Sequence, residues 1–155
     1  MATAGTTGGV IKVEGLGELF KKLEALGASK KEFVDANFRA AKTLRDAVRP
    51  LVPTSEGSKG ENGKLYRYKT PGALKASVRA SKGLGYASVM AGNARVPYAN
   101  PIHFGWFEDK NNFVAKNIKP NLFVYRAIDS TKEKIMSQYN EDMQNLINKY
   151  GLGEN

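Results

Sequence analysis

Few side chains in this sequence are suited to acid–base or nucleophilic chemistry. The chain has no cysteine and a single histidine, His103, which excludes thiolate chemistry, disulfides and a multi-histidine metal centre within one chain. Glu108 and Asp109 are adjacent carboxylates, but Lys110 beside them is typical of a solvated corner. His103 stands in the aromatic and apolar stretch 102–106 without a serine or metal-ligand motif, which favours a packed or interface histidine. We therefore expect no enzymatic activity, no metal and no cofactor.

Positive charge is the second feature with chemical meaning. The 155-residue chain has a net charge of +9, and residues 53–95 carry eight Lys or Arg against two Asp or Glu. No acidic residue stands between Glu61 and Glu108. Such a strip attracts nucleic acid or an acidic protein surface, although it also fits a protein whose surface charge is simply uneven. Tyr66 and Tyr68, interleaved with basic residues, either stack on bases or pack where a loop rejoins a sheet.

The motifs that would turn this charge into a nucleotide site are absent from the sequence. There is no GxxxxGK[ST] loop and no GxGxxG between a strand and a helix, and Gly83–Gly85 fits a hairpin turn better. No apolar run approaches the roughly 20 residues of a membrane-spanning helix. With 41% apolar and 25% charged residues, the composition is that of one globular domain.

Helical spacing of apolar residues predicts three helices. A short one covers residues 16–26. A longer one begins after the capping-box pattern of Ser29 and Glu32 and ends at Pro50, because proline has no amide for the helix. The last begins at Pro120 and runs for about eight turns to a glycine cap.

Strand patterns are shorter and less regular. Four segments have the composition or the alternation of strands: 10–14, 74–81, 86–91 and 98–106. The second and third are joined by a turn and form a hairpin, and two prolines confine the fourth to a sheet edge. The expected fold class is α+β, a small antiparallel sheet of three to four strands with two long helices packed on one face.

Polar, glycine-rich sequence separates these elements. Residues 53–70 predict a long mobile loop that becomes ordered on assembly, and 107–118 predict a second loop. We expect a flexible N-terminal tail over residues 1–9 rather than a secretory signal, a single domain over 10–151, and a C-terminal tail over 152–155.

Four segments, taken in order, resemble a known family. They combine a helix ending in prolines, a T-P-G-A-L-K-A-S run, a Tyr-Ala followed by Phe-Gly, and a Lys-Pro that opens the last helix: 40–53, 70–78, 98–105 and 119–127. This order is similar to that of the tail-completion, or head–tail joining, proteins of siphophage necks. The resemblance covers about residues 15–150, and it rests on the order of the segments rather than on any single one.

The resemblance implies a structural protein of the virion, assembled in the host cytoplasm. Members of that family form rings, here expected to be hexameric, between the head-side connector or stopper and the tail terminator or tail tube. Double-stranded DNA passes through the lumen, and no membrane is involved. The alternatives are a tail terminator and a small basic nucleic-acid-binding module.

Two groups of residues are candidate contacts on this hypothesis. The DNA channel or an acidic neighbouring ring would meet four cations of the predicted loop: Lys59, Lys64, Arg67 and Lys69. The neighbouring subunit would meet an aromatic cluster: His103, Phe104, Trp106 and Phe107. Trp106 and Phe107 could equally be core aromatics at the end of a strand.

Overall fold

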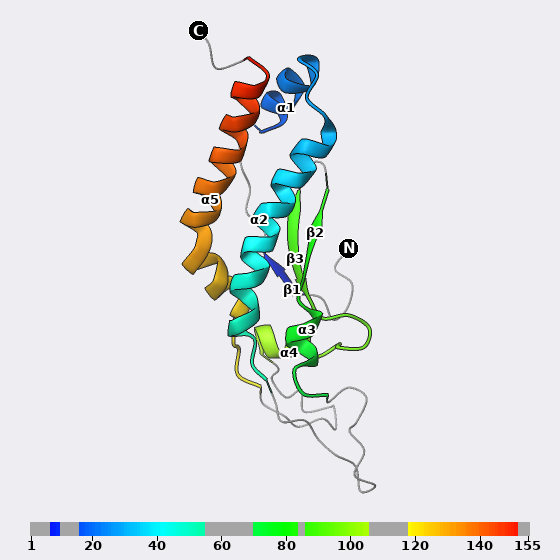
Figure 1. The fold of residues 1–155 in the computed structure, drawn as a ribbon. Coiled ribbons are helices and arrows are strands. Elements are labelled where there is room, and N and C mark those ends of the chain that lie inside the picture. The colour runs from blue at the N-terminus through cyan, green and yellow to red at the C-terminus, as the bar shows by residue number, and fades with distance from the viewer. Residues whose placement is uncertain (1–6, 10–15, 55–69, 84–85, 106–117, 152–155) are drawn as a thin grey trace, which may run out of the picture.

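The computed structural model describes residues 7–9, 16–54, 70–83, 86–105 and 118–151 (Figure 1). The elements, in chain order, are β1 (Thr7–Gly9), α1 (Leu16–Ala25), α2 (Lys30–Leu51), α3 (Ala73–Ser77), β2 (Arg79–Lys82), β3 (Ala87–Ala91), α4 (Ala99–Phe104) and α5 (Phe123–Lys149). The long helices α2 and α5 run antiparallel, and α2 lies between α5 and the β2–β3 hairpin. The short helices α3 and α4 lie at the end where α2 finishes and α5 begins.

Helix α2 forms as its sequence predicts. At its start, the carboxylate of Glu32 accepts a hydrogen bond from the amide of Ser29 at 2.9 Å, as in a capping box. Buried side chains recur every three to four residues, from Phe33 to Val48, and face the sheet and α5. Pro50 is tolerated in the last turn, and the helix ends one residue later.

Helix α5 is the longest element, and it begins at Phe123, three residues after the proline expected to open it. Its end is as predicted, because Gly151 adopts a left-handed φ of 74° that stops the helix. Polar contacts join α5 to α2 along their exposed border. Arg39 pairs with Asp142 at 2.9 Å, and the hydroxyl of Thr43 donates to Gln138 at 2.9 Å.

The expected mixed fold, with long helices and an antiparallel sheet, is confirmed. The sheet is smaller than expected, since it is one hairpin, β2–β3, to which the three residues of β1 add along the other edge of β3. The expectation of a flexible tail over residues 1–9 is wrong for residues 7–9, which form the short strand β1. The strand expected over 10–14 lies outside the described residues.

One of the expected strands, 98–106, is wrong, and another, 74–81, is right only in its second half, which is β2. The segment 74–77 belongs to α3, because Leu74 and Val78 are buried while Ala76 between them is exposed, which fits a helical turn and not the alternation of a strand. The segment 98–104 forms α4, since Pro101 falls in the first turn of the helix, where no amide is needed. Each short helix adjoins a glycine with positive φ, 72° at Gly72 and 85° at Gly105.

The core has two parts along the molecule. One lies between the second half of α2, the sheet, α3, α4 and the start of α5, and the other joins α1 to the beginning of α2 and the end of α5. Buried Asn37 connects the layers, because its amide donates to the carbonyl of Gly83 at 3.0 Å and its oxygen accepts from Tyr139 at 3.1 Å. None of the described helices is both long enough and apolar enough to cross a bilayer.

Candidate binding surfaces

Most of the residues singled out from the sequence fall outside the described part of the chain. These are Lys59, Lys64, Arg67, Lys69, Trp106 and Phe107. The predicted loop 53–70 is described only at its two ends, and the predicted tail 152–155 is not described. The structure therefore places two members of the expected subunit contact, His103 and Phe104.

His103 lies inside the molecule rather than on its surface. Its side chain is fully buried in α4, with ring centroids 4.5 Å from Phe104, 4.7 Å from Phe123 and 5.0 Å from Tyr125. Neither ring nitrogen has a hydrogen-bond partner among the described residues. Burial lowers the pKa of His103 from 6.5 to about 4, so the ring is neutral at neutral pH. A neutral imidazole enclosed by aromatic rings packs there, and it offers nothing to a second subunit.

Proton transfer and metal binding find no support at this histidine. A general base needs an acidic or nucleophilic neighbour within hydrogen-bond reach, and the rings of Phe104, Phe123 and Tyr125 face the imidazole instead. Across the described residues, no group of three or more His, Cys, Asp or Glu side chains could hold a metal ion.

Phe104 forms part of an exposed apolar patch with two residues of the α5 start. Phe104, Leu122 and Tyr125 are 46%, 39% and 41% exposed, and the rings of Phe104 and Tyr125 lie 6.1 Å apart. Leu122 has a φ of 53°, a left-handed conformation that costs a branched residue free energy. Its amide donates to the carbonyl of His103 at 3.0 Å, which fixes the junction of α4 and α5. An apolar side chain held out in a strained backbone is a candidate contact.

The sequence identified Phe104 but not the other two residues of this patch. Tyr125 follows buried Val124 in α5, and the apolar spacing of the helix runs through Val124 rather than Tyr125. Leu122 is recognised as a candidate contact only from its left-handed backbone conformation, which the sequence does not predict.

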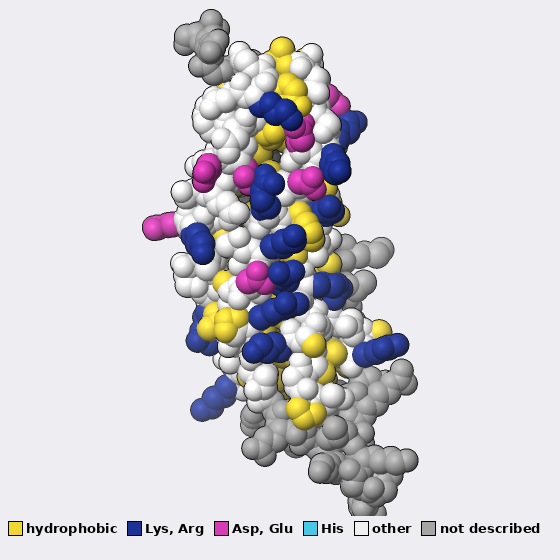
Figure 2. Space-filling model, viewed as in Figure 1, with side chains coloured by type: hydrophobic (Ala, Val, Ile, Leu, Met, Phe, Trp, Pro, Cys, Tyr) yellow, Lys and Arg dark blue, Asp and Glu magenta, His cyan; other side chains and the backbone are white. Residues whose placement is uncertain are grey.

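Five cations of α2 and β2 form a second candidate surface, here called the basic band: Lys42, Arg45, Arg49, Arg79 and Lys82. Figure 2 shows dark-blue side chains following the exposed side of α2. The α2 members stand three and four residues apart, so they share one side of the helix. The β2 members lie beside them because α2 packs on that strand.

Phe38 links the two rows of the basic band. The ammonium of Lys42 is 4.5 Å from the centroid of the Phe38 ring, and that of Lys82 is 4.8 Å from it. Each is within the range of a cation–π interaction. Asp35 also pairs with Lys82, at 3.5 Å.

Charge is distributed unevenly along the molecule. One end of the molecule carries ten described cations and three carboxylates. This end consists of the second half of α2, α3, the first residue of β2, α4 and the start of α5. The cations are Lys42, Arg45, Arg49, Lys75, Arg79, Arg95, Lys119, Arg126, Lys132 and Lys134; the carboxylates are Asp46, Asp129 and Glu133. The rest of the described chain, with α1, has seven cations and six carboxylates; Lys82, one of the seven, lies at the border, near the same Phe38 ring as Lys42. We call the first the basic end.

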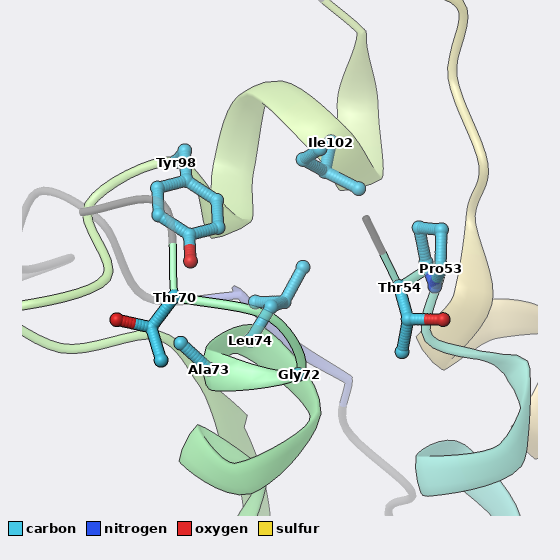
Figure 3. A pocket seen from close by; sticks show the side chains of 8 residues that line it. All are labelled: Pro53, Thr54, Thr70, Gly72, Ala73, Leu74, Tyr98 and Ile102. Carbon is cyan, nitrogen blue, oxygen red and sulfur yellow. The ribbon is translucent and has the colours of Figure 1, made fainter. Parts of the chain in front are cut away.

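A half-open cavity of about 130 Å³ lies at the basic end (Figure 3). Its walls come from the end of α2, the start of α3 and the turn into α4: Pro53, Thr54, Thr70, Gly72, Ala73, Leu74, Tyr98 and Ile102. Leu74 and Ile102 give it an apolar floor, and among the described residues that line it the ionisable side chain is that of Tyr98, whose pKa is raised by burial.

Comparison with models of known protein families, with curated proteins and with solved structures gives no match for this chain.

Proposed function

We propose that this chain is a structural ring subunit of a siphophage neck, a tail-completion protein that joins the DNA-filled head to the tail. The observation that carries the proposal is spatial. The four segments that resemble the family are far apart in sequence, yet Val48, Leu74, Ala99 and Phe123, one from each, pack in one hydrophobic cluster. An order of segments that resembles that of a family is easier to understand when those segments build one structural unit.

The subunit would act by shape and contact rather than by chemistry. Its partners are further copies of itself in a hexameric ring, the head-side connector or stopper, the tail terminator or tail tube, and the double-stranded DNA in the lumen. It would be found in the virion.

The apolar patch of Phe104, Leu122 and Tyr125 supplies the subunit contact in this proposal. A ring with cyclic symmetry is held by heterologous contacts, in which a patch on one subunit meets a different surface on the next. Exposed aromatic side chains are common energetic anchors of such contacts. Trp106 and Phe107 follow directly in sequence and would extend the same contact.

Deletion of the gene, followed by negative-stain electron microscopy of the lysate, tests the function. We expect filled heads beside unattached tails of normal length. Tails of uncontrolled length would instead identify a tail terminator. Intact particles in normal number would contradict a neck role, and the basic band would then favour a small nucleic-acid-binding module.

Complementation of that deletion tests the apolar patch. Phe104→Asp and Tyr125→Asp each place a charge in the exposed patch, and joined particles should become rare. Both rings also cover His103, so circular dichroism of each purified variant must show that the fold is kept. Leu26→Asp is the matched control, because Leu26 is 48% exposed and lies at the α1 end. Normal joining by Phe104→Asp and Tyr125→Asp would show that this patch is not the subunit contact.

A further inference from the structure

Three cations of the basic band are held in place by uncharged groups. Arg49 donates to the carbonyl of Val78 at 3.1 Å, Arg79 donates to the carbonyl of Gly92 at 2.9 Å, and Lys42 lies over the ring of Phe38. No described carboxylate forms an ion pair with any of them. The described residues thus orient these three charges without neutralising them.

The other two members of the basic band are only partly neutralised. Arg45 pairs with Asp46 at 2.8 Å, and Lys82 pairs with Asp35 at 3.5 Å on an exposed surface. Exposed pairs of this kind are weak, typically about 0–1 kcal/mol. The basic band as a whole retains an excess of positive charge, with two ammonium groups gathered around the ring of Phe38.

Holding several cations close together raises the electrostatic free energy of the protein, and a bound anion lowers it. Like charges repel, and an arginine held by one carbonyl still presents its exposed N–H donors to an external acceptor. These donors do not include the Nε of Arg49, which is buried, and one nitrogen of Arg79 already lies 3.9 Å from the sulfur of Met90. A phosphate group is such an acceptor, because it accepts charge-assisted hydrogen bonds from arginine and lysine. The missing counter-charge is therefore expected from a partner.

We propose that the basic band binds the sugar–phosphate backbone of duplex DNA, without reading its sequence. This deepens the proposed function and rests on it for the identity of the DNA, that of the phage lumen. The surface is distinct from the four cations of the loop 53–70, because it is built on α2 and β2. A rigid helix and a paired strand position the charges before the DNA arrives.

The extent of the charge favours DNA over an acidic protein. Lys42 and Arg49 are seven residues apart, about 10 Å along α2 at 1.5 Å per residue. The β2 row lies alongside, and the excess charge continues over the whole basic end. A compact acidic patch would match only part of this area, whereas a duplex offers a phosphate about every 1.7 Å along its axis.

Fluorescence anisotropy of the full chain with a fluorescein-labelled duplex of random sequence tests the proposal. We expect binding at low salt that weakens at least about tenfold between 0.05 and 0.2 M salt, as counterion release requires. The double variant Lys42→Gln/Lys82→Gln removes two exposed charges without touching the core, and we expect it to bind about tenfold more weakly with a shallower salt slope. Lys42→Arg should bind like the wild type.

The matched control is Lys21→Gln/Lys22→Gln. These two lysines are exposed on α1, at the opposite end, and their loss changes the net charge by the same amount. We expect the control to keep its affinity within about twofold, because charges far beyond a Debye length of about 10 Å contribute little.

Three outcomes would overturn the proposal. They are no binding of the wild type to DNA at low salt, equal weakening by both double variants, and tighter binding to polyglutamate than to DNA with the same dependence on Lys42 and Lys82. The last would assign the surface to an acidic protein.

Joining of heads and tails is measured separately, so a chain that binds no DNA but is needed for joining would refute DNA binding by the basic band alone. A DNA-binding chain that is dispensable for joining would refute the neck role alone.

Discussion

His103 shows how one buried residue couples protonation to folding. The aromatic rings of Phe104, Phe123 and Tyr125 surround the imidazole, and burial lowers its pKa from 6.5 to about 4. An unfolded chain binds the proton below about pH 6.5, whereas the folded chain does so only below about pH 4. The neutral ring therefore supports folding fully above pH 6.5, and this contribution is lost as the pH falls toward 4.

Replacement of His103 by leucine tests this coupling. Neither ring nitrogen has a hydrogen-bond partner in the described part of the chain, so His103→Leu should change the free energy of unfolding at pH 7.5 by less than about 1.5 kcal/mol. The variant should lose less stability than the wild type between pH 6.5 and 4 in urea titrations. Parallel curves for the two proteins over that range would contradict the assignment.

Glu32 has the opposite charge and a different pH range. Its carboxylate accepts hydrogen bonds from Lys149 at 2.5 Å, the amide of Ser29 at 2.9 Å and the hydroxyl of Tyr150 at 2.8 Å. These contacts, the one from Lys149 foremost, lower the pKa of Glu32 from 4.5 to about 2. The stability that Glu32 contributes is therefore present above pH 4.5 and is lost as the pH falls through the folded pKa near 2.

We expect Glu32→Gln to destabilise the chain at pH 7 by about 1–2 kcal/mol, since a helix cap and the link between α2 and α5 are both weakened. The difference from the wild type should shrink as the pH falls from 4.5 toward 2. Glu24→Gln is the control. Glu24 forms one exposed pair with Lys30 at 3.6 Å, so its loss should cost less than about 0.5 kcal/mol. Chemical unfolding monitored by circular dichroism measures all three proteins, and an equal cost for the two variants would contradict this prediction.

At the scale of elements, the sequence predicts long structure better than short structure. Apolar spacing and caps specify α2 and α5 because many residues agree on one helical face. Five or six residues, as in α3 and α4, do not distinguish a helix from a strand by periodicity. Their helical form depends on Gly72 and Gly105, whose positive φ values become evident only once the chain has folded.

The site was predictable only in part, for a related reason. The stretch without acidic residues includes Arg79 and Lys82, so two of the five members of the basic band could be recognised in the sequence as part of a charge run. The other three lie on α2, 30 to 40 residues earlier in the chain, where the cations look like an ordinary solvated helix face. Packing of α2 on β2 brings the cations of the two elements together, and this contact cannot be predicted from the sequence alone.

Asn37 tests how the layers are held together. Its side chain joins α2 to the carbonyl of Gly83 and to the hydroxyl of Tyr139 in α5. Asn37→Leu should destabilise the fold by about 2–3 kcal/mol, because buried polar groups in two other elements lose their partner. Thermal unfolding measures the effect.

The double variant Asn37→Leu/Tyr139→Phe separates the polar link from simple packing. The free energy of unfolding lost in the double variant should be about 0.5–1.5 kcal/mol smaller than the sum of the losses in Asn37→Leu and Tyr139→Phe measured separately. Additive losses would mean that the Asn37–Tyr139 hydrogen bond contributes nothing beyond the space that its groups fill.

At the scale of the whole molecule, the uneven distribution of charge would affect how subunits assemble into the proposed ring. Cyclic symmetry places the same end of each subunit on the same rim, so all basic ends of a ring would lie together. Ten described cations against three carboxylates at each of these ends would repel their neighbours. In the proposed ring, contact through the apolar patch near Phe104 would act against that repulsion, and screening of charge by salt would assist it.

We therefore expect ring formation by the purified chain to increase with ionic strength. Raising the salt from about 0.02 to 0.3 M shortens the Debye length several-fold and weakens repulsion between basic ends, while contact between apolar side chains is retained. Sedimentation velocity at several salt concentrations measures the fraction in rings. The variant Lys42→Gln/Arg45→Gln/Lys75→Gln, with less charge at the basic end, should form rings at lower salt than the wild type does. If rings instead dissociate as salt is added, attraction between opposite charges rather than apolar contact holds the subunits together, and the contact must be sought away from the basic end.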